Sequence, residues 1–492
     1  MGTLEKVFKH IDDHLNEHIA KMQEFIRQPS VSQTQEGIQE CAELLRGYLK
    51  ELGCKDARLV EPEYYCPIVY GEYDAGAEKT VIIYLMYDVQ PPDPIEEWSV
   101  PPFEGKLVEL PPFKKVLMAR GAINTKGPLM AFLNAMGSIR DAAGELPVNL
   151  IFVAEGEEEK LSVSLPKFVR DNQSKLKKAD AVYFPGASQT LDGLAYLRFG
   201  SEGIIYLELE CSGEKWGRGP TKFGVHGINQ RILDNPAWRM VHALSTLTNE
   251  TGSKVLVEGW YDDVVVPSEA DLQVLEKGYR KSIPAVKVFD PEIQKKLLEA
   301  KVFIEDLTDP KEILKRSIFA TTFCLDGISG GWTGPGSKTY VPTRVISKHN
   351  IRLVPKQNID DIIRKIRAHL DKHGYRDIEI RKLGGYPWAL VNYKTKLAEA
   401  IYATFERFGV PYVIMPPVAS VETAPAWPAY IFSGEPLNLP IVWGALGHGG
   451  RAHSPNEYYV IEGADAKYGR IHGLDGAEKS MATVLYNFAD KT

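Results

Sequence analysis

Two adjacent glutamates, Glu158 and Glu159, follow a run of apolar residues that is typical of a buried strand. Asp88 follows a second such run, rich in β-branched residues, at 80–85. A short acidic turn after a buried strand is a usual place for a site in an α/β domain. Together with His453 from the other end of the chain, these carboxylates have the chemistry either to bind a divalent metal ion or to transfer protons.

The surrounding sequence alternates between predicted helices and strands, which indicates a parallel or mixed sheet covered on both faces. Apolar residues at helical spacing predict a helix over 4–27 and a second helix over 37–52. Strands are expected at 81–85 and 148–154, with a helix that begins near Gly127 between them.

Three histidines four residues apart lie in the first predicted helix: His10, His14 and His18. This spacing places them on one face of the helix, where such a ladder either binds a metal ion or faces solvent. Because no shell of carboxylates is evident near them, we favour a solvated face.

The pattern changes near the middle of the chain. Residues 204–211 alternate apolar and polar side chains, as a half-exposed strand does. A second strand is predicted at 344–355 and a helix at 359–372, and the chain then returns to a helix at 394–408 and a strand at 440–443.

These elements divide the chain into two predicted domains. A smaller α+β domain at 205–385 is inserted into a discontinuous α/β domain made of 1–204 and 386–492. We expect the strand at 204–211 to lie at an edge of its sheet. Such an edge is available for pairing with a second subunit.

Composition and charge argue against several classes of function. The 492 residues carry a net charge of −7, which gives no sign of the basic patch that nucleic-acid binding favours. The five cysteines are scattered, so neither a disulfide framework nor a cysteine zinc site is expected. No apolar run approaches the length of a membrane span, and no signal peptide is apparent. We expect a cytoplasmic protein that binds neither nucleic acid nor membrane.

Several motifs in a fixed order resemble the carnosinase, cytosolic dipeptidase and acetylornithine-deacetylase family of two-zinc peptidases and deacylases. The resemblance spans nearly the whole chain and rests on segments 84–92, 119–128, 155–159, 334–342, 350–355, 384–388 and 453–457. It implies a large three-layer α/β domain of the zinc-peptidase kind, an inserted lid domain and a homodimer formed through the lid. It also implies two zinc or manganese ions with a bridging aspartate, and a glutamate as general base.

The resemblance assigns metal-site roles to positions of this chain, and only some of these positions hold suitable residues. Glu158 falls on the base, Glu159 and His453 fall on metal ligands, and Asp88 keeps the place of an orienting aspartate. The other ligand positions hold residues that bind zinc poorly or not at all: Met86, Asn124 and Gly186. Two dications bring about four positive charges into a partly buried cleft, and too few anionic ligands remain to balance them.

Six residues are expected to contact the substrate: Arg352, His226, Glu422, Met86, Trp427 and His448. By the resemblance, Arg352 pairs with a substrate carboxylate, a planar contact that arginine makes well. His226 either reaches the active site of a neighbouring subunit or is a turn histidine. Compared with the family pattern, the loop beside Glu422 lacks glycines and contains Trp427, which predicts a differently shaped and more apolar pocket. His448 is either a new acid or base or a loop histidine.

These observations favour an enzyme that needs no metal, so no cofactor is expected. In this hypothesis Glu158, Glu159, His453, Asn124 and Asp88 perform acid–base chemistry on a small amino-acid-derived carboxylate, as a lyase, isomerase, decarboxylase or hydrolase of an activated amide. A second hypothesis is a metal-dependent amidohydrolase or dipeptidase that retains one zinc or manganese ion. A third is a catalytically inactive relative that binds ligands or stabilises an assembly.

Overall fold

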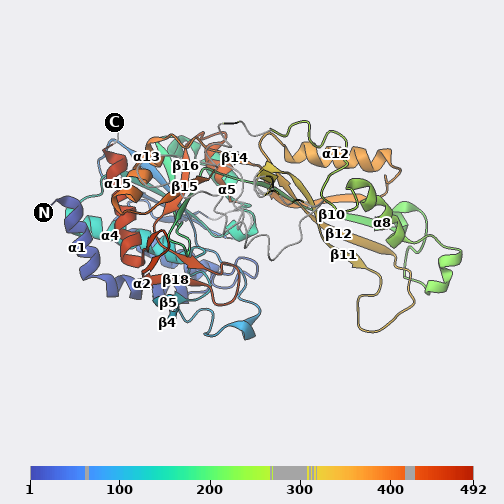
Figure 1. Cartoon of the computed structure of the whole chain (residues 1–492), viewed down its shortest axis with the longest axis horizontal. Coiled ribbons are helices and arrows are strands. Elements are labelled where there is room, and N and C mark those ends of the chain that lie inside the picture. Colours follow the sequence, from blue (N-terminus) through green and yellow to red (C-terminus); the bar gives the residue numbers. More distant parts are fainter. Residues whose placement is uncertain are drawn as a thin grey trace.

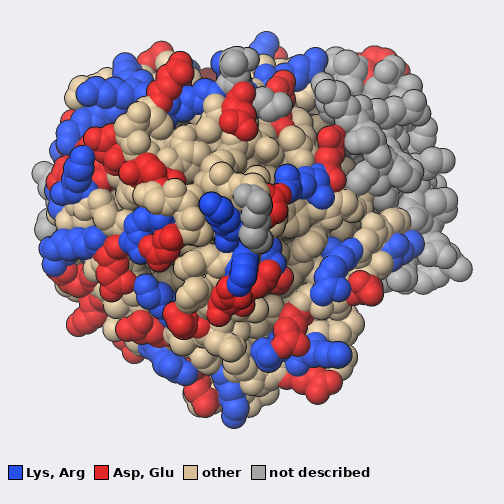
Figure 2. Space-filling view, turned by 90° about the vertical axis from the view of Figure 1, so that its left-hand side faces the viewer, with Lys and Arg blue, Asp and Glu red and all other residues tan. Residues whose placement is uncertain are grey.

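The computed structural model describes residues 2–60, 66–265, 320–415 and 427–490, with isolated positions between 269 and 319. Figure 1 shows a large lobe that contains both chain ends and a smaller lobe built from the middle of the chain. Figure 2 shows basic and acidic side chains intermixed over the face it presents. Within the described ranges, no helix combines the length and the apolarity that a membrane crossing requires.

An eight-stranded mixed sheet forms the centre of the large lobe, in the strand order β1-β2-β6-β3-β7-β16-β8-β15. In that order the bounds are Arg58–Val60, Ile68–Tyr73, Asn149–Glu155, Thr80–Met86, Ala181–Ala187, Ile441–Ala445, Ala195–Arg198 and Tyr412–Met415. β3 is parallel to β6 and β7, and β16 is parallel to β7. The carboxyl ends of these four strands therefore meet at one edge of the sheet.

The side chains of β3 show how the sheet is covered on both faces. Ile83 and Leu85 enter one apolar layer, whereas Tyr84 and Met86 enter the other, as the two-residue period of a strand requires. The first layer contains the helices α1 (Thr3–Asp13), α2 (Leu15–Arg27), α3 (Ile38–Leu52), α4 (Lys126–Ala143), α13 (Lys396–Arg407) and α15 (Leu474–Ala489). The second contains α5 (Leu165–Asp171), α6 (Gln173–Leu176) and α14 (Ala429–Ser433). The predicted three-layer α/β domain is confirmed.

The first predicted helix is in fact two helices, α1 and α2, separated at His14. The prediction that its histidines face solvent is wrong, because this face packs against α4 and α15. His10 Nδ1 lies 3.2 Å from Ser138 Oγ on α4. His18 is buried, and its Nδ1 lies 2.7 Å from Glu478 Oε2 on α15.

The small lobe contains a four-stranded antiparallel sheet in the order β11-β12-β10-β13, with bounds Thr322–Gly330, Arg344–Leu353, Gly203–Ser212 and Glu379–Tyr386. Helices α8 (Pro236–Leu247) and α12 (Ile359–Lys372) pack on one face of this sheet. β10 lies between β12 and β13, so the prediction of an edge strand at 204–211 is wrong. Its alternating pattern arises because an internal antiparallel strand has one covered face.

The chain enters the small lobe at β10 and leaves it after β13. The short strands β9 (Gly200–Ser201) and β14 (Ala389–Leu390) pair at this crossing. We propose that the two domain boundaries lie here, close to residues 205 and 385.

The large lobe also contains a four-stranded antiparallel sheet. Its strands run in the order β17-β18-β5-β4, with bounds Gly449–Gly450, Tyr458–Glu462, Phe113–Met118 and Lys106–Leu110. The loop from β5 to α4 and the loop from β17 to β18 leave this sheet and carry site residues. The short elements α7 (Gly213–Trp216), β19 (Ala464–Ala466) and β20 (Gly469–Ile471) lie outside these sheets.

We predict that His18→Ala lowers the free energy of unfolding by about 3–5 kcal/mol, since it leaves the buried Glu478 carboxylate with the Asn134 amide as its remaining side-chain partner. Urea denaturation measures this change. Lys9→Ala is the control, because its ion pair with Asp13 is exposed and contributes little. Equal effects of the two substitutions would contradict a structural role for His18.

Candidate active site

The carboxyl ends of β3 and β6 position the acidic groups of the site. β6 ends at Glu155, and a short 3₁₀ turn at Glu158–Lys160 follows it. Asp88, just after β3, is fully buried, and its carboxylate accepts hydrogen bonds from the backbone N–H groups of Glu158 (3.2 Å) and Glu159 (3.0 Å). Asp88 therefore fixes the backbone that carries the two glutamates.

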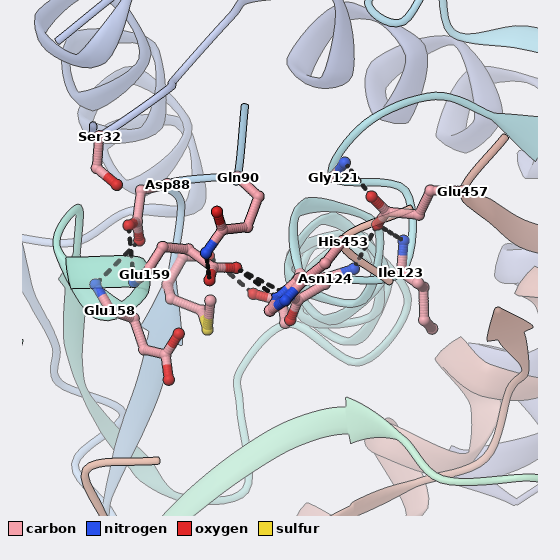
Figure 3. A network of polar contacts seen from close by, with 12 residues as sticks. Ser32, Asp88, Gln90, Gly121, Ile123, Asn124, Glu158, Glu159, His453 and Glu457 are labelled. Carbon is pink, nitrogen blue, oxygen red and sulfur yellow. Dashed lines mark hydrogen bonds and ion pairs between the residues drawn. The ribbon is translucent and has the colours of Figure 1, made fainter. Parts of the chain in front are cut away.

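Glu457 clamps a second turn, which connects β5 to α4. Its Oε1 accepts hydrogen bonds from the backbone N–H groups of Ile123 and Asn124, both at 2.9 Å, and its Oε2 accepts from Gly121 N–H at 3.0 Å (Figure 3). Glu457 is fully buried, and the buried Arg120 compensates its charge across 2.8 Å. The clamp fixes the backbone position from which the Asn124 side chain extends.

Three side chains from these turns and from the β17–β18 loop converge on one point (Figure 3). Asn124 Nδ2 lies 2.6 Å from Glu159 Oε1 and 2.8 Å from His453 Nε2, and His453 Nε2 lies 3.1 Å from Glu159 Oε1. Gln90 Nε2 donates a 2.7 Å hydrogen bond to the other Glu159 oxygen. The structure thus brings together the predicted residues Asn124, Glu159 and His453, with Glu158 next to Glu159 in the same turn.

His453 is presented by a loop with an unusual backbone. Its φ is +63°, in the left-handed region that costs a non-glycine residue about 1–2 kcal/mol. Asn456 anchors the loop: its side-chain oxygen accepts a 2.7 Å hydrogen bond from Ser99 N–H, and its amide donates to Glu97 O at 2.9 Å. Strain that the surrounding structure enforces in this way is typical of functional sites.

Burial and mutual repulsion govern the titration of the acidic groups. Burial, followed by repulsion from Glu159, Asp88 and Glu155, raises the pKa of Glu158 well above its usual range. Burial, followed by repulsion from Glu159, raises the pKa of Asp88 to about 7. The hydrogen bond to Glu159 raises the pKa of His453. Among the described residues, the Glu158 carboxylate has no hydrogen-bond partner (Figure 3), so it is available to a ligand.

Met86 and Trp427, both predicted to contact the substrate, lie in an aromatic layer beside the polar residues. They are only 3% and 2% exposed and pack with Tyr84 and Phe184. The Trp427 ring lies 5.7 Å from the Phe184 ring, and its Nε1 donates a 3.1 Å hydrogen bond to Gly200 O. The structure therefore places both side chains in the apolar core rather than among the polar groups of the site.

Trp443 fills the space beside Gly186, where the resemblance places a metal-binding aspartate. A Cβ atom at Gly186 would lie 2.1 Å from Trp443 Nε1, so any side chain there collides with the indole. A carboxylate at this position requires Trp443 to move.

Arg352, the predicted carboxylate anchor, already has an acidic neighbour. Its Nη1 lies 3.5 Å from Oε2 of Glu202, which is buried where the chain enters the small lobe. Burial raises the pKa of Glu202, and the nearby Arg352 opposes this shift. Glu422, predicted to lie near the substrate, falls outside the described residues.

The two other predicted histidines have local structural roles. His226 is exposed on the small lobe, and its Nδ1 accepts a 3.1 Å hydrogen bond from Ile228 N–H at the start of a turn. His448 is buried: its Nδ1 lies 2.6 Å from Gln189 O, and burial lowers its pKa. These contacts favour the turn and loop alternatives within this one chain.

Sequence reasoning missed four residues of the site: Gln90, Glu155, Glu202 and Glu457. Gln90 lies two residues after Asp88 in the same turn, which was a usable signal. Glu457 ends the singled-out motif at 453–457, but its partner Arg120 is 337 residues away. Glu202 had no detectable signal, because its partner Arg352 is 150 residues away.

Three side chains with possible metal-binding atoms meet at one point: Asn124, Glu159 and His453. The edges of their triangle, 2.6, 2.8 and 3.1 Å, are hydrogen-bond lengths. Ligands about 2.0–2.2 Å from a tetrahedral ion lie about 3.4 Å apart, so these side chains must move apart slightly to hold an ion. A half-turn of the Asn124 amide presents its oxygen as the third donor. That donor is needed, because the described residues contain no group of three or more His, Cys, Asp or Glu that could hold a metal. The Trp443 indole fills the space beside Gly186, where a further carboxylate ligand would lie.

An α/β lobe with acidic turns at its strand ends and an inserted antiparallel lobe defines a zinc-peptidase-like protein. The profile described as Peptidase family M20/M25/M40 matches residues 83–468. The chain belongs to this family, which confirms the resemblance seen in the motifs.

Two curated relatives cover most of this chain. The Cys-Gly metallodipeptidase DUG1 of Candida albicans is 30% identical over 384 residues, 73% of this chain and 74% of that protein. The Beta-Ala-His dipeptidase of Homo sapiens is 27% identical over 416 residues, 79% of this chain and 76% of that protein.

Solved structures share the whole fold. The M20 family metallo-carboxypeptidase Sso-CP2 from Sulfolobus solfataricus has a TM-score of 0.81 and 31% identity, covering 96% of this chain and 99% of that one. Human carnosine dipeptidase 1 has a TM-score of 0.75 at 24% identity, covering 99% of this chain and 100% of that one.

These comparisons correct one prediction. The expectation that no cofactor is needed is wrong, because relatives that share the family and most of the chain are named metallodipeptidases and a metallo-carboxypeptidase. The hypothesis of a metal-independent lyase, isomerase or decarboxylase loses its support with it. The residues Met86, Asn124 and Gly186 remove anionic donors, but Glu159 and His453 remain and Asn124 keeps a neutral donor atom.

Glu155 is a buried carboxyl group outside the Asn124–Glu159–His453 triangle, and its titration makes the stability of the fold depend on pH. Its Oε1 accepts hydrogen bonds from the hydroxyls of Tyr84 (2.6 Å) and Ser162 (2.9 Å), while Oε2 is buried without a partner. Burial raises its pKa from 4.5 to about 8. Between these two values the folded state holds a proton that the unfolded state has released, so the contribution of Glu155 to stability falls as pH rises.

We predict that Glu155→Gln has little effect on unfolding near pH 4.5 and stabilises the protein, relative to wild type, increasingly up to about pH 8. Glutamine keeps an oxygen for the two hydroxyls and removes the buried charge. Urea unfolding of both proteins across this range measures the difference. A stability difference that does not change with pH would show that Glu155 titrates normally in the folded protein.

Proposed function

We propose that this protein hydrolyses the amide bond of a small dipeptide or a similar amino-acid amide, using one metal ion. The observation that supports this most directly is the donor triangle of Glu159, Asn124 and His453 next to the unpaired Glu158 carboxylate. When bound, the ion supplies a Lewis acid for the amide carbonyl and a more acidic water.

Charge balance favours one zinc or manganese ion in this proposal. Glu158 and Glu159 together carry two negative charges when ionised, and His453 and Asn124 contribute neutral donors. One dication is therefore neutralised at the site. A second adds an excess charge, and the nearby carboxylates of Asp88 and Glu155 are already held by backbone and hydroxyl donors.

Glu158 is the general base in this mechanism. Its position beside Glu159 places a free carboxylate next to the donor triangle, where it takes a proton from the attacking water and delivers it to the leaving amine. Asp88 and Gln90 act indirectly: Asp88 holds the backbone of the glutamate turn, and Gln90 orients Glu159.

The relatives and the surface of the small lobe support proposals for the substrate class and the assembly. The relatives are named for Cys-Gly and Beta-Ala-His dipeptides, so we propose a small peptide substrate with a free carboxylate. We also propose a homodimer through the small lobe, where the described apolar side chains of Phe223, Ile232 and Trp238 are 74%, 79% and 58% exposed. A cytoplasmic location stays a prediction.

We predict that chelator-treated protein binds one equivalent of zinc or manganese per chain, measured by elemental analysis after gel filtration. Glu159→Gln and His453→Ala each weaken this binding at least about ten-fold, since each removes one of three donors. His373→Ala, at an exposed histidine of the small lobe, leaves the stoichiometry unchanged. Two tightly bound equivalents in wild-type protein would rule out the single-ion site.

We predict that Glu158→Gln lowers kcat for dipeptide hydrolysis by about 10²- to 10⁴-fold, the usual contribution of a general base. Cys-Gly and β-Ala-His are suitable first substrates, and metal content is measured in the same samples. Glu96→Gln, at an exposed carboxylate, serves as the control. Unchanged turnover by metal-loaded Glu158→Gln protein would remove Glu158 from the mechanism.

A further inference from the structure

The glutamate turn, residues 157–162, ends in two residues with a strained backbone. Leu161 and Ser162 have φ values of +69° and +48°, in the left-handed region that residues other than glycine rarely adopt. Such a backbone persists only where its surroundings hold it in place. Asp88 holds the first half of the turn through two backbone N–H groups. The contacts of Leu161 and Ser162 therefore decide where the second half of the turn lies.

Strand β13 of the small lobe meets this second half at two points. A Cβ atom at Gly384 would lie 2.3 Å from Leu161 Cδ1, so the glycine lets the Leu161 side chain lie against the strand. Two residues further on, the Tyr386 hydroxyl lies 3.0 Å from Ser162 Oγ. Positions two apart point to the same face of a strand. One face of β13 therefore supports the glutamate turn.

The Tyr386 hydroxyl lies between two acceptors of the turn. Its oxygen is 3.0 Å from Ser162 Oγ and 3.4 Å from the backbone oxygen of Glu158. Ser162 Oγ donates its own proton to Glu155 Oε1 at 2.9 Å, so it accepts from Tyr386. Burial, followed by repulsion from Glu158 and Glu155, raises the pKa of Tyr386 well above its usual range, so the hydroxyl keeps its proton. This one proton serves both Ser162 and the Glu158 carbonyl group.

Tyr386 is itself held firmly where the chain leaves the small lobe. It is the last residue of β13, it is 1% exposed, and it pairs with Ile204 of β10. Its ring lies 5.8 Å from the ring of Tyr430 on α14 of the large lobe. A buried side chain at this crossing ties the position of the glutamate turn to the small lobe.

We propose that Tyr386 is a positioning residue for the general base, and that its hydroxyl holds the backbone of Glu158 in place from the small lobe. This rests on the proposed function, in which Glu158 takes a proton from the attacking water. Without the hydroxyl the carboxylate is still present, but the turn that carries it moves more freely. A small displacement of a catalytic group lowers the rate of the chemical step. The effect is therefore expected on kcat rather than on KM.

Tyr386→Phe tests the contact, because phenylalanine keeps the ring and removes the hydroxyl. Hydrogen exchange of a peptide covering residues 157–164 is measured by mass spectrometry on metal-free protein, since backbone N–H groups of the turn bond within it. We expect exchange in this peptide to be about 3- to 10-fold faster than in wild type, the scale of one hydrogen bond. Exchange in β6 is expected to stay the same. Unaltered exchange over 157–164 in the folded variant would overturn the proposal.

Tyr402→Phe is the matched control. It removes another buried tyrosine hydroxyl that donates to a backbone oxygen, that of Tyr393 at 2.8 Å, from helix α13. Exchange over 157–164 and turnover are expected to match wild type in this variant. Thermal unfolding checks that each variant is folded.

Ser162→Ala tests whether the hydroxyl acts through the turn. This variant removes an acceptor of the same Tyr386 proton, so the double variant is expected to accelerate exchange by less than the product of the two single effects. Effects that multiply fully would contradict the shared contact.

Turnover connects the contact to the base. Metal-loaded Tyr386→Phe is expected to hydrolyse Cys-Gly with kcat about 10-fold lower per bound metal ion and with KM unchanged. An unchanged kcat would remove Tyr386 from the positioning of Glu158. If wild-type protein hydrolyses neither Cys-Gly nor β-Ala-His, the proposed function itself fails, whereas the exchange experiment still decides whether Tyr386 holds the turn.

Discussion

Charge balance around the paired glutamates constrains the rest of the site. Asp88 and Glu155 are fully buried and Glu158 is half-buried, and burial is the largest cause that raises the pKa of each. Carboxylates removed from water need hydrogen bonds or cations to compensate them. Backbone amides serve Asp88, hydroxyl groups serve Glu155, and His453 with Asn124 serves Glu159. Glu158 alone has no such partner among the described residues, which is why the chemistry is expected there.

Met86 and Gly186, two positions where the resemblance places metal ligands, lie at one continuous apolar layer. Met86 points into the layer that contains Tyr84 and Phe184, and Trp443 packs against Phe184 with ring centroids 5.0 Å apart. Aromatic pairs of this kind add about 0.5–1.5 kcal/mol beyond the burial of their surface. Around Met86 and Gly186 the structure is thus hydrophobic core, and its packing leaves no room for a carboxylate at Gly186 unless Trp443 moves. The proposed single-ion site rests on the polar groups that remain, Glu159, Asn124 and His453.

The sequence predicted local structure well and long-range pairing poorly. Periodicity located β3, β6, β10 and α12 to within two residues, because each pattern is set by the layer that covers the element. It missed the break at His14 and the internal position of β10, which depend on what packs against them. In the site, motif order identified Glu159, Asn124 and His453. The Glu457–Arg120 and Glu202–Arg352 contacts stayed hidden, since nothing local indicates which acid meets which arginine.

The allocation of carboxylates among the arginines leaves one acid of the site without a cation. Arg120 and Arg352 each lie beside a buried carboxylate, so each forms a nearly neutral unit that attracts an anion weakly. Among the described residues, the Glu158 carboxylate has no hydrogen-bond partner of its own (Figure 3). The negative potential of the glutamate turn is therefore least compensated at Glu158, and this potential favours a cationic group there.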